Sequence, residues 1–271
     1  MAIYLGSNKE FVSKYFIYDV TPIHEKNASE FPDKLLSVCD VYLGQDIRKE
    51  NKFGIQFSDE YIVERLRPDC KRIIFPNLVG MGKMMFIQSY YEAGGKNADA
   101  AMPYGFFPYG DSVIDRLYEE GYSAEEIIIE IAKGKFFSEE QIRSNFDEMV
   151  EQFKKRERNW DVKIVDYILE NYRERQVFYD HYHPTNVLYE YIAREILGQL
   201  NVSAKQLACP WEQDSYETFV YPEVARALEM KWWNDNCELR KQATSYRFEA
   251  HMDYGEWVRE YIAWCYERNK G

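Results

Sequence analysis

Apolar residues in the first part of the chain occur in short runs that alternate with segments of helical spacing. The runs at residues 15–20, 38–45 and 72–77 are rich in aromatic and branched side chains and predict strands. Helices are predicted between them, at residues 32–38 and from Ser58 onward. Strands and helices that alternate at such short spacing indicate parallel strand pairing through crossover helices.

The middle of the chain changes character. Residues 80–110 are irregular and rich in glycine, which is typical of a functional or mobile loop. Helices are predicted after this segment, including a long charged one over residues 139–158 and a further one over residues 162–171. Side chains suited to capping the first turn of a helix mark three starts, at Asp111, at Ser123 with Glu126, and at Ser138 with Gln141.

The last third begins with a predicted strand and continues as helix. Residues 176–179 form a short apolar run, and Pro184 is suited to the first position of a helix that reaches about residue 200. Two more helices are predicted at residues 222–231 and 254–268. Residues 2–5 can supply an opening strand at the other end of the chain.

These elements together predict an α/β fold in which a mainly parallel sheet is flanked by helices. The expected α/β domain covers residues 1–203 and carries a helical insertion at about residues 111–172. Residues 204–271 are expected to form a helical C-terminal extension packed on that domain.

The charge of the chain limits the classes of partner. Its formal net charge is −12 and its pI is about 5.0, whereas nucleic-acid binding in general requires a basic face. This balance leaves room for a local basic pocket that holds a phosphorylated ligand. No apolar run approaches the roughly 20 residues that a membrane span requires, and residues 1–6 are too short and polar for a signal peptide.

The cysteines indicate a reducing compartment. There are five of them, an odd number, and no pair shows the C-x-x-C spacing of structural zinc sites. Reduced thiols in a cytoplasmic protein are the expected state.

The first candidate for chemistry is Asp180, three residues before His183 and at the end of a predicted strand. A carboxylate at this spacing can fold back in a turn, orient the imidazole and stabilise its protonated form. An imidazole with an ordinary pKa of about 6.5 is suited to proton transfer near neutral pH. The alternative is purely structural: His183 caps the following helix and Asp180 makes turn hydrogen bonds.

Other candidates follow the remaining predicted strands. Asn77 can donate its side-chain N–H to a developing oxyanion, or it is an ordinary turn residue after Pro76. Gln45 can hydrogen bond to a ligand, or it ends a strand beside a solvated loop. Ser7 can act as a nucleophile if a base reaches it, or it belongs to a frayed terminus.

Two further patterns have a structural alternative that we favour. Residues 110–112 spell the Gly-Asp-Ser tripeptide that carries the nucleophile of one esterase superfamily, but they follow Pro108 and Tyr109 rather than a hydrophobic strand, and the simpler interpretation is that Asp111 caps a helix. His181 and His183 are two residues apart, so an extended backbone would place both on one side, where Asp180 can join them as metal ligands. No further ligand cluster is visible, and no metal is expected.

Three segments resemble the WcbI family of polysaccharide-biosynthesis proteins. They are Phe-Pro-Asn-Leu at residues 75–78, Pro-Tyr-Gly-Asp-Ser-Val-Ile at residues 108–114, and His-Pro-Thr-Asn at residues 183–186, which precedes the helical segment at residues 192–197. The resemblance covers roughly residues 40–200. It implies a three-layer fold akin to the SGNH hydrolases, binding of coenzyme A, and acetyl transfer to a sugar of a capsular or surface polysaccharide.

The resemblance also assigns roles to residues. Asp180 and His183 match the last motif of the SGNH hydrolases, in which the histidine is the general base, so His183 is expected to deprotonate the acceptor hydroxyl while Asp180 orients it. Asn77 and Gln45 are expected to contact the oxyanion or the ligand, and Ser7 is a candidate nucleophile or oxyanion donor. The ligand contacts with coenzyme A or acetyl-coenzyme A are expected to come from Gln45, Asn77, His181, Thr185 and Asn186.

One segment departs from the family pattern. The family opens with a Gly-Asn-Cys-Gln loop after its first strand, whereas this chain has Gly6, Ser7, Asn8 and Lys9 there. Direct transfer from acetyl-coenzyme A to a sugar needs no protein nucleophile and accommodates the missing cysteine. Two other functions stay open, a carbohydrate esterase of SGNH type and a non-catalytic protein that binds a sugar or nucleotide on the same scaffold.

Overall fold

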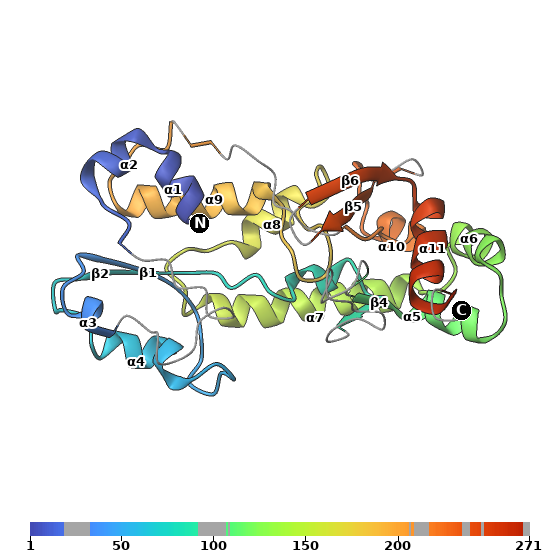
Figure 1. Ribbon diagram of the computed structural model, residues 1–271, viewed down its shortest axis with the longest axis horizontal. Helices are drawn as coiled ribbons and strands as arrows, with labels where there is room; N and C mark the ends of the chain where they lie inside the picture. The colour runs from blue at the N-terminus through green and yellow to red at the C-terminus, as the bar shows by residue number, and fades with distance from the viewer. Residues whose placement is uncertain are drawn as a thin grey trace. The chain divides into compact units, whose positions relative to one another are not determined.

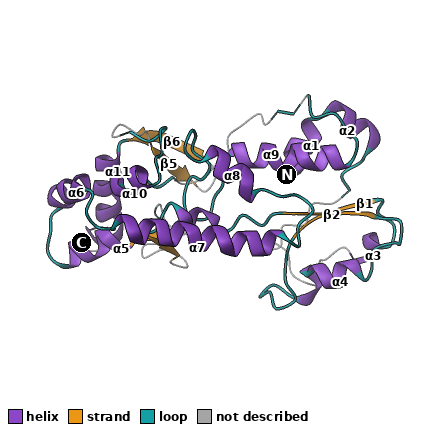
Figure 2. Ribbon diagram, turned by 180° about the vertical axis from the view of Figure 1, so that it is seen from behind, coloured by secondary structure: helices purple, strands orange, loops and turns teal. Residues whose placement is uncertain are grey.

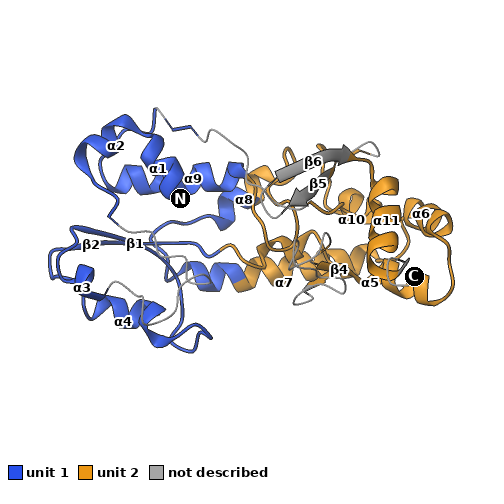
Figure 3. Ribbon diagram, in the orientation of Figure 1, with its two compact units in different colours: residues 1–77, 153–168, 186–211 blue, residues 78–152, 169–185, 212–271 orange. Residues whose placement is uncertain are grey.

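A computed structural model describes residues 1–18, 33–91, 107, 109–205, 207–208, 217–234, 239–244 and 247–267 of the 271-residue chain. Helices make up most of the regular structure, and the strands form short pairs (Figure 1, Figure 2). The chain divides into two compact units, each built from three separate stretches of sequence (Figure 3). Unit 1 comprises residues 1–77, 153–168 and 186–211, and unit 2 comprises residues 78–152, 169–185 and 212–271.

Unit 1 contains the parallel strand pair that the sequence predicts. Strand β1 pairs with β2 in the register Val41 to Lys71 through Gln45 to Phe75. The elements of this unit in chain order are α1 (Ala2–Ser7), α2 (Lys9–Lys14), α3 (Asp33–Leu36), β1 (Val41–Gln45), the 3-10 turn η2 (Ile55–Phe57), α4 (Asp59–Val63), β2 (Lys71–Phe75) and α9 (Asn186–Gln199).

The core of unit 1 forms where helix α9 packs against β2 and α1 (Figure 1). Ile73 and Ile74 of β2 are fully buried, as are Leu188 and Ile196 of α9. Burying four branched side chains of this size contributes roughly 1.5–3 kcal/mol each, which is enough to hold a two-stranded pair that would be marginal alone.

The outer edge of β2 is closed by the segment that follows helix α7. Asp161 Oδ2 accepts a hydrogen bond from Ile74 N at 2.7 Å, and Ile74 O accepts from Asp161 N at 2.7 Å and Val162 N at 3.3 Å. Because these groups satisfy both polar atoms of Ile74 on the side away from β1, the strand pair ends there.

The described part of unit 2 is mainly helical and carries two antiparallel strand pairs, β3 with β4 and β5 with β6. Its elements are the 3-10 turn η3 (Met81–Met84), β3 (Ser89–Tyr91), β4 (Tyr109–Asp111), α5 (Ser112–Glu119), α6 (Ala124–Lys133), α10 (Pro222–Ala227), β5 (Leu239–Thr244), β6 (Arg247–Met252), α11 (Tyr254–Ile262) and the π-helical turn η4 (Ala263–Glu267). Helices α7 (Glu139–Glu157) and α8 (Val165–Asn171) have residues in both units.

Several predicted helix starts are confirmed in atomic detail. The Ser123 hydroxyl accepts from Glu126 N while the Glu126 carboxylate accepts from Ser123 N, and Ser138 and Gln141 make the same reciprocal pair. Ser58 caps α4 through Tyr61 N at 3.2 Å. The predicted helices at residues 32–38, 139–158 and 162–171 correspond to α3, α7 and α8.

Three predicted strands are wrong. Residues 2–5 belong to α1, where the adjacent residues Tyr4 and Leu5 are both buried and the helix packs against α9; neighbours in a strand would point to opposite faces. Residues 15–18 form no regular element, and residues 19 and 20 lie outside the described chain.

The third error is at residues 176–179. There the chain makes a single antiparallel bridge between Phe178 and Pro184, since proline has no N–H with which to extend a ladder. Helix α9 consequently begins at Asn186 rather than at Pro184. The β5–β6 hairpin lies in the last part of the chain, for which the sequence predicted only helices. The domain boundary predicted near residue 203 stays a prediction.

Candidate functional site

The segment of residues 177–185 folds into a compact loop in unit 2. Tyr179 N donates to His183 O at 2.8 Å, and Thr185 N donates to Val177 O at 3.0 Å. A glycine permits the close approach of the neighbouring turn: a Cβ atom at Gly82 would lie 2.1 Å from Asp180 O. The backbone that carries Asp180 is therefore fixed from within the loop and from outside it.

Asp180 is fully buried and uses both carboxylate oxygens. Oδ1 accepts from Tyr182 N at 2.6 Å and His183 N at 2.8 Å, and Oδ2 lies 2.8 Å from His183 Nδ1. Since a carboxylate with this set of donors can only accept, Nδ1 carries the proton and donates to it. The predicted orientation of the imidazole by a carboxylate three residues earlier is present in the structure.

The second ring nitrogen of His183, Nε2, is not engaged by the loop. The His183 side chain is 36% exposed, and no group in the described chain hydrogen bonds to Nε2. Burial lowers the pKa of His183, but the charge and hydrogen bond of Asp180 outweigh that effect, so the pKa lies above its ordinary value. With Nδ1 held by Asp180, Nε2 is the atom that can take up a proton.

His181 has the opposite environment. It is fully buried, and neither ring nitrogen has a hydrogen-bond partner among the described residues. Burial lowers its pKa to about 4; Asp180 opposes this shift, and the charges of Lys83 and His183 add to it. His181 is therefore a neutral imidazole near neutral pH.

Tyr109 packs against both histidines and was not selected from the sequence. Its hydroxyl lies 3.5 Å from His183 Nδ1, its ring meets the His181 ring edge-on at 4.4 Å, and it stacks on Tyr182 at 5.5 Å. Tyr109 comes from β4, far from the loop in sequence. The only indication of it in the sequence was its place in the segment of residues 108–114 that resembles the WcbI family.

The second group of predicted residues lies at the carboxyl ends of β1 and β2 in unit 1. Gln45 ends β1, and Asn77 follows β2 by two residues. Asp46 Oδ2 accepts from Trp160 Nε1 at 2.9 Å, and Arg156 Nη2 donates to Asn77 O at 3.4 Å. The final turn of α7 and the segment after it thus bring an arginine and a tryptophan to this edge.

Arg156 is a half-buried cation at this edge. Its guanidinium lies over the rings of Phe153 at 4.8 Å and Trp160 at 5.6 Å, and within the described ranges no carboxylate oxygen lies within 4.0 Å of it. Burial lowers the pKa of Arg156, with Asp46 opposing, yet an arginine stays charged throughout the physiological range. Sequence reasoning missed this residue because it sits in a helix dominated by charged side chains.

The remaining predicted residues have clear structural partners. The Ser7 hydroxyl donates to Tyr4 O at 2.7 Å and accepts from Ala208 N at 3.1 Å. The Thr185 hydroxyl is buried and donates to Gln176 O at 3.1 Å. Asn186 begins α9, and its backbone oxygen accepts from the Tyr4 hydroxyl at 3.3 Å.

These predicted residues fall into two groups by unit. Asp180, His181, His183 and Thr185 belong to unit 2, where the first three are in one loop. Ser7, Gln45, Asn77 and Asn186 belong to unit 1. Each unit is described by itself, so a joint role for the two groups stays a prediction.

The Gly-Asp-Ser tripeptide is a helix start. Asp111 Oδ1 accepts from Val113 N and Ile114 N at 3.0 Å each and from the Tyr221 hydroxyl at 2.9 Å. Ser112 is exposed on the first turn of α5. The predicted capping role of Asp111 is confirmed.

Comparison with known proteins identifies the family. The family model described as "Polysaccharide biosynthesis enzyme WcbI" matches residues 1–205. This chain belongs to the WcbI family. A solved structure of WcbI, described as a novel polysaccharide biosynthesis enzyme, matches 99% of this chain and 86% of its own with a TM-score of 0.75 and 17% sequence identity. No curated protein matches.

That WcbI structure is described as native protein without a disulfide bond between coenzyme A and one of its cysteines. Near the start of this chain, Ser7 is the last residue of α1, and the Asn8 side chain caps α2 by accepting from Phe11 N at 2.9 Å. The segment where this chain departs from the family pattern is therefore a helix–helix junction.

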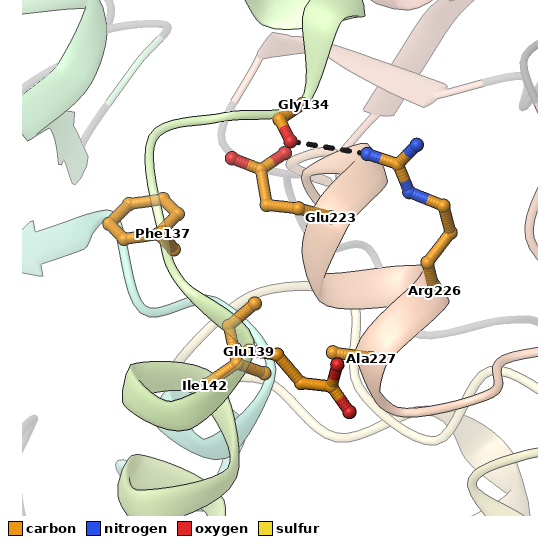
Figure 4. Close-up of a pocket in the computed structure, with 7 residues that line it drawn as sticks. All are labelled: Gly134, Phe137, Glu139, Ile142, Glu223, Arg226 and Ala227. Carbon is orange, nitrogen blue, oxygen red and sulfur yellow. Dashed lines mark hydrogen bonds between the residues drawn. The ribbon is translucent and has the colours of Figure 1, made fainter.

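One further cavity lies in unit 2, between α10 and the start of α7 (Figure 4). It encloses about 290 Å³ and is lined by Gly134, Phe137, Glu139, Ile142, Glu223, Arg226 and Ala227. None of the residues predicted from the sequence lines this cavity. Within the described ranges, no three His, Cys, Asp or Glu side chains are arranged so that they could hold a metal ion.

No helix in the described part of the chain combines the length and apolar character needed to span a bilayer.

Proposed function

We propose that this member of the WcbI family is an acyltransferase that moves an acetyl group from acetyl-coenzyme A to a sugar hydroxyl during polysaccharide biosynthesis. The observation that carries the proposal is the pairing of buried Asp180 with half-exposed His183. In this proposal Nε2 of His183 is the base, and the Asp180 carboxylate stabilises the conjugate acid of the imidazole.

The chemistry assigned to the pair is a single proton relay. His183 Nε2 takes the proton of the acceptor hydroxyl as that oxygen attacks the thioester carbonyl. The carbon–sulfur bond then breaks, coenzyme A leaves as a thiolate, and the proton on His183 passes to that sulfur. Asp180 keeps Nδ1 protonated throughout, which leaves Nε2 as the atom that exchanges the proton.

This route uses no protein nucleophile. It fits a chain in which the family's Gly-Asn-Cys-Gln loop is replaced by Gly6, Ser7, Asn8 and Lys9. The Ser7 hydroxyl donates to Tyr4 O and accepts from Ala208 N at the end of α1, and these bonds disfavour its use as a nucleophile. Its role as oxyanion donor stays a prediction.

Coenzyme A is supported as the donor by the family and by the structure of a relative described with reference to that molecule. Its phosphates require cations, and Arg156 supplies a guanidinium that donates to Asn77 O and has no carboxylate oxygen within 4.0 Å in the described chain. We assign coenzyme A contacts to Arg156, Gln45 and Asn77, and keep His181, Thr185 and Asn186 as proposed contacts of the bound substrates. A protein that uses acetyl-coenzyme A needs access to the pool of this donor inside the cell, and we therefore keep the cytoplasm as the predicted location.

The rival functions gain no specific support. A carbohydrate esterase of SGNH type would place a serine within hydrogen-bond reach of His183, and in the described ranges the ring contacts Asp180 and the Tyr109 hydroxyl instead. A non-catalytic scaffold would bury His183 as a helix cap, whereas α9 begins at Asn186 and the imidazole is 36% exposed. The three-layer SGNH arrangement stays a prediction.

Calorimetric titration with coenzyme A and acetyl-coenzyme A tests the donor, and transfer of labelled acetyl to a panel of sugars tests the reaction. We expect both ligands to bind the natural protein and His183→Ala, with transfer lost only in the variant. Arg156→Gln is expected to weaken binding of both ligands about tenfold. Absence of binding to either ligand would overturn the proposal, and unchanged transfer by His183→Ala would remove His183 as the base.

A further inference from the structure

Two cysteines of unit 1 face each other at the amino ends of the parallel strands. Cys39 lies two residues before β1 and Cys70 immediately before β2, and their sulfur atoms are 3.6 Å apart. Both side chains are half-buried, so solvent reaches them. A covalent S–S bond spans about 2.05 Å, and the two sulfurs therefore need to approach by only about 1.5 Å.

The backbone on both sides of the pair is held by hydrogen bonds. Cys39 N donates to Leu35 O at 3.0 Å, Cys70 N donates to Arg67 O at 3.0 Å, and Lys71 N donates to Asp40 O at 2.8 Å. The last of these bonds begins the β1–β2 ladder. The proximity of the sulfurs is thus a consequence of strand register rather than of a chance encounter between loops.

We propose that Cys39 and Cys70 form a reversible intramolecular disulfide, which makes this pair a redox modification site separate from the coenzyme A chemistry. The oxidant is a small-molecule disulfide. One cysteine thiolate attacks it, forms a mixed disulfide and releases one thiolate. The second cysteine then attacks the protein sulfur of that mixed disulfide and releases the other. Two protein thiols are oxidised, one external disulfide is reduced to two thiols, and two protons pass from the protein to them.

Burial and the neighbouring sulfur both act on the Cys70 thiol. Burial raises the pKa of Cys70 to about 12, and the hydrogen bond and charge of Cys39 add to that shift. The reduced Cys70 thiol is therefore a weak nucleophile near neutral pH. Once Cys39 is a mixed disulfide it no longer carries a charge that opposes ionisation of Cys70, so the second step becomes easier.

The crosslink would tie the starts of the two strands and enclose η2 and α4 between its ends. Gln45 and Asn77 lie at the opposite, carboxyl ends of the same strands. We therefore expect the disulfide to stabilise unit 1 while leaving coenzyme A binding unchanged, which separates this inference from the proposed function.

The test is incubation of the full chain with glutathione disulfide, followed by alkylation of remaining thiols and peptide mapping. We expect a crosslinked peptide containing Cys39 and Cys70, and their alkylation is expected to fall about tenfold and to return after dithiothreitol. Oxidation is expected to accelerate as the pH rises from neutral, because thiolate is the attacking species.

The variants Cys39→Ser and Cys70→Ser are each expected to stop at a glutathione adduct on the remaining cysteine of the pair. Cys265→Ser serves as the matched control, since that cysteine lies in unit 2 and its removal should leave the crosslink intact. Peptide mapping of the natural chain gives a result even if a cysteine variant fails to fold. Full alkylation of both Cys39 and Cys70 after oxidation, or their appearance in crosslinks to other cysteines only, would overturn the inference.

Discussion

Asp111 and Asp180 are two buried aspartates of unit 2 with almost the same local geometry. In each, Oδ1 accepts the backbone N–H groups of the residues two and three positions later. Each carboxylate also receives one hydrogen bond from a side chain, Tyr221 for Asp111 and His183 for Asp180. The same turn motif thus occurs once at the start of α5 and once in the loop at residues 177–185.

The two aspartates differ in their second oxygen. Oδ2 of Asp180 meets a half-exposed imidazole that can exchange a proton with a ligand. Oδ2 of Asp111 is buried and has no hydrogen-bond partner among the described residues, and burial raises the pKa of Asp111 to about 7. The Asp180 carboxylate therefore stabilises the protonated form of the half-exposed His183 imidazole. In Asp111 the same turn holds a buried carboxyl group whose ionisation lowers the stability of the protein.

The largest expected effect is on the side of Asp180. His183→Ala removes the base, and acetyl transfer is expected to fall about 10³-fold while acetyl-coenzyme A binding stays within about twofold. Labelled-acetyl transfer and calorimetry measure the two quantities. Ser112→Ala, an exposed change beside Asp111, is the matched control and should retain full transfer. An equal loss in both variants would contradict the assignment.

Asp180→Asn should produce the next largest effect. Its amide can no longer accept from His183 Nδ1 with a full charge, so transfer is expected to fall about 100-fold. The pKa of His183 is raised by Asp180, and the base must be neutral to act, so activity of the natural protein should rise with pH through a value above 6.5. In the variant this limb should move to lower pH. A limb that stays in place would show that Asp180 does not set the state of His183.

Asp111→Asn should act on stability instead. In the native protein the raised pKa means that Asp111 binds a proton between about pH 4 and 7 when the unfolded chain does not, so the free energy of unfolding falls as pH rises through this window. The variant retains an acceptor oxygen but no charge. We expect it to be more stable than the natural protein by about 4 kcal/mol at pH 8 and nearly equal at pH 4.

Urea unfolding of both proteins at pH 4, 6 and 8 measures this difference. Transfer activity of Asp111→Asn at neutral pH should stay within about twofold of the natural value, because Asp111 contacts no group of the Asp180 loop among its hydrogen bonds. A stability difference that does not change with pH would rule out ionisation of Asp111 as its cause.

The smallest effect is expected for Tyr109→Phe. The hydroxyl lies 3.5 Å from His183 Nδ1, which is too long for a strong hydrogen bond, and the ring contacts with His181 and Tyr182 are retained. Transfer should fall less than about threefold. A much larger loss in the same transfer assay would make the Tyr109 hydroxyl a direct participant and weaken the contrast with Tyr221, which only supports Asp111.

Sequence patterns were most informative where a local rule decides the structure. The strands β1 and β2, the caps at Asp111 and Ser123, and the Asp180–His183 pairing all depend on residues close in sequence, and all were predicted. Residues 2–5 and 176–179 are short apolar runs, which fit a strand or a buried helix or loop equally well until the rest of the fold is known.

The contacts that escaped prediction join distant segments. Tyr109 reaches the histidine loop from β4, and Arg156 reaches Asn77 from the end of α7. No local sequence rule predicts either contact, because each one depends on where two distant elements meet in the fold. The lowered pKa of His181 likewise results from its burial, and the residues near His181 in the sequence do not predict that burial.

The hydrogen bonds of Asp161 with Ile74 have a consequence for self-association. An open strand edge is a template for another copy of a chain, and a two-stranded sheet has two such edges and little else to protect it. At Ile74, an acidic side chain and two backbone amides already occupy the groups that an incoming strand would need. Asp161 and Val162 therefore leave no free backbone N–H or C=O at Ile74 with which the strand of another chain could pair.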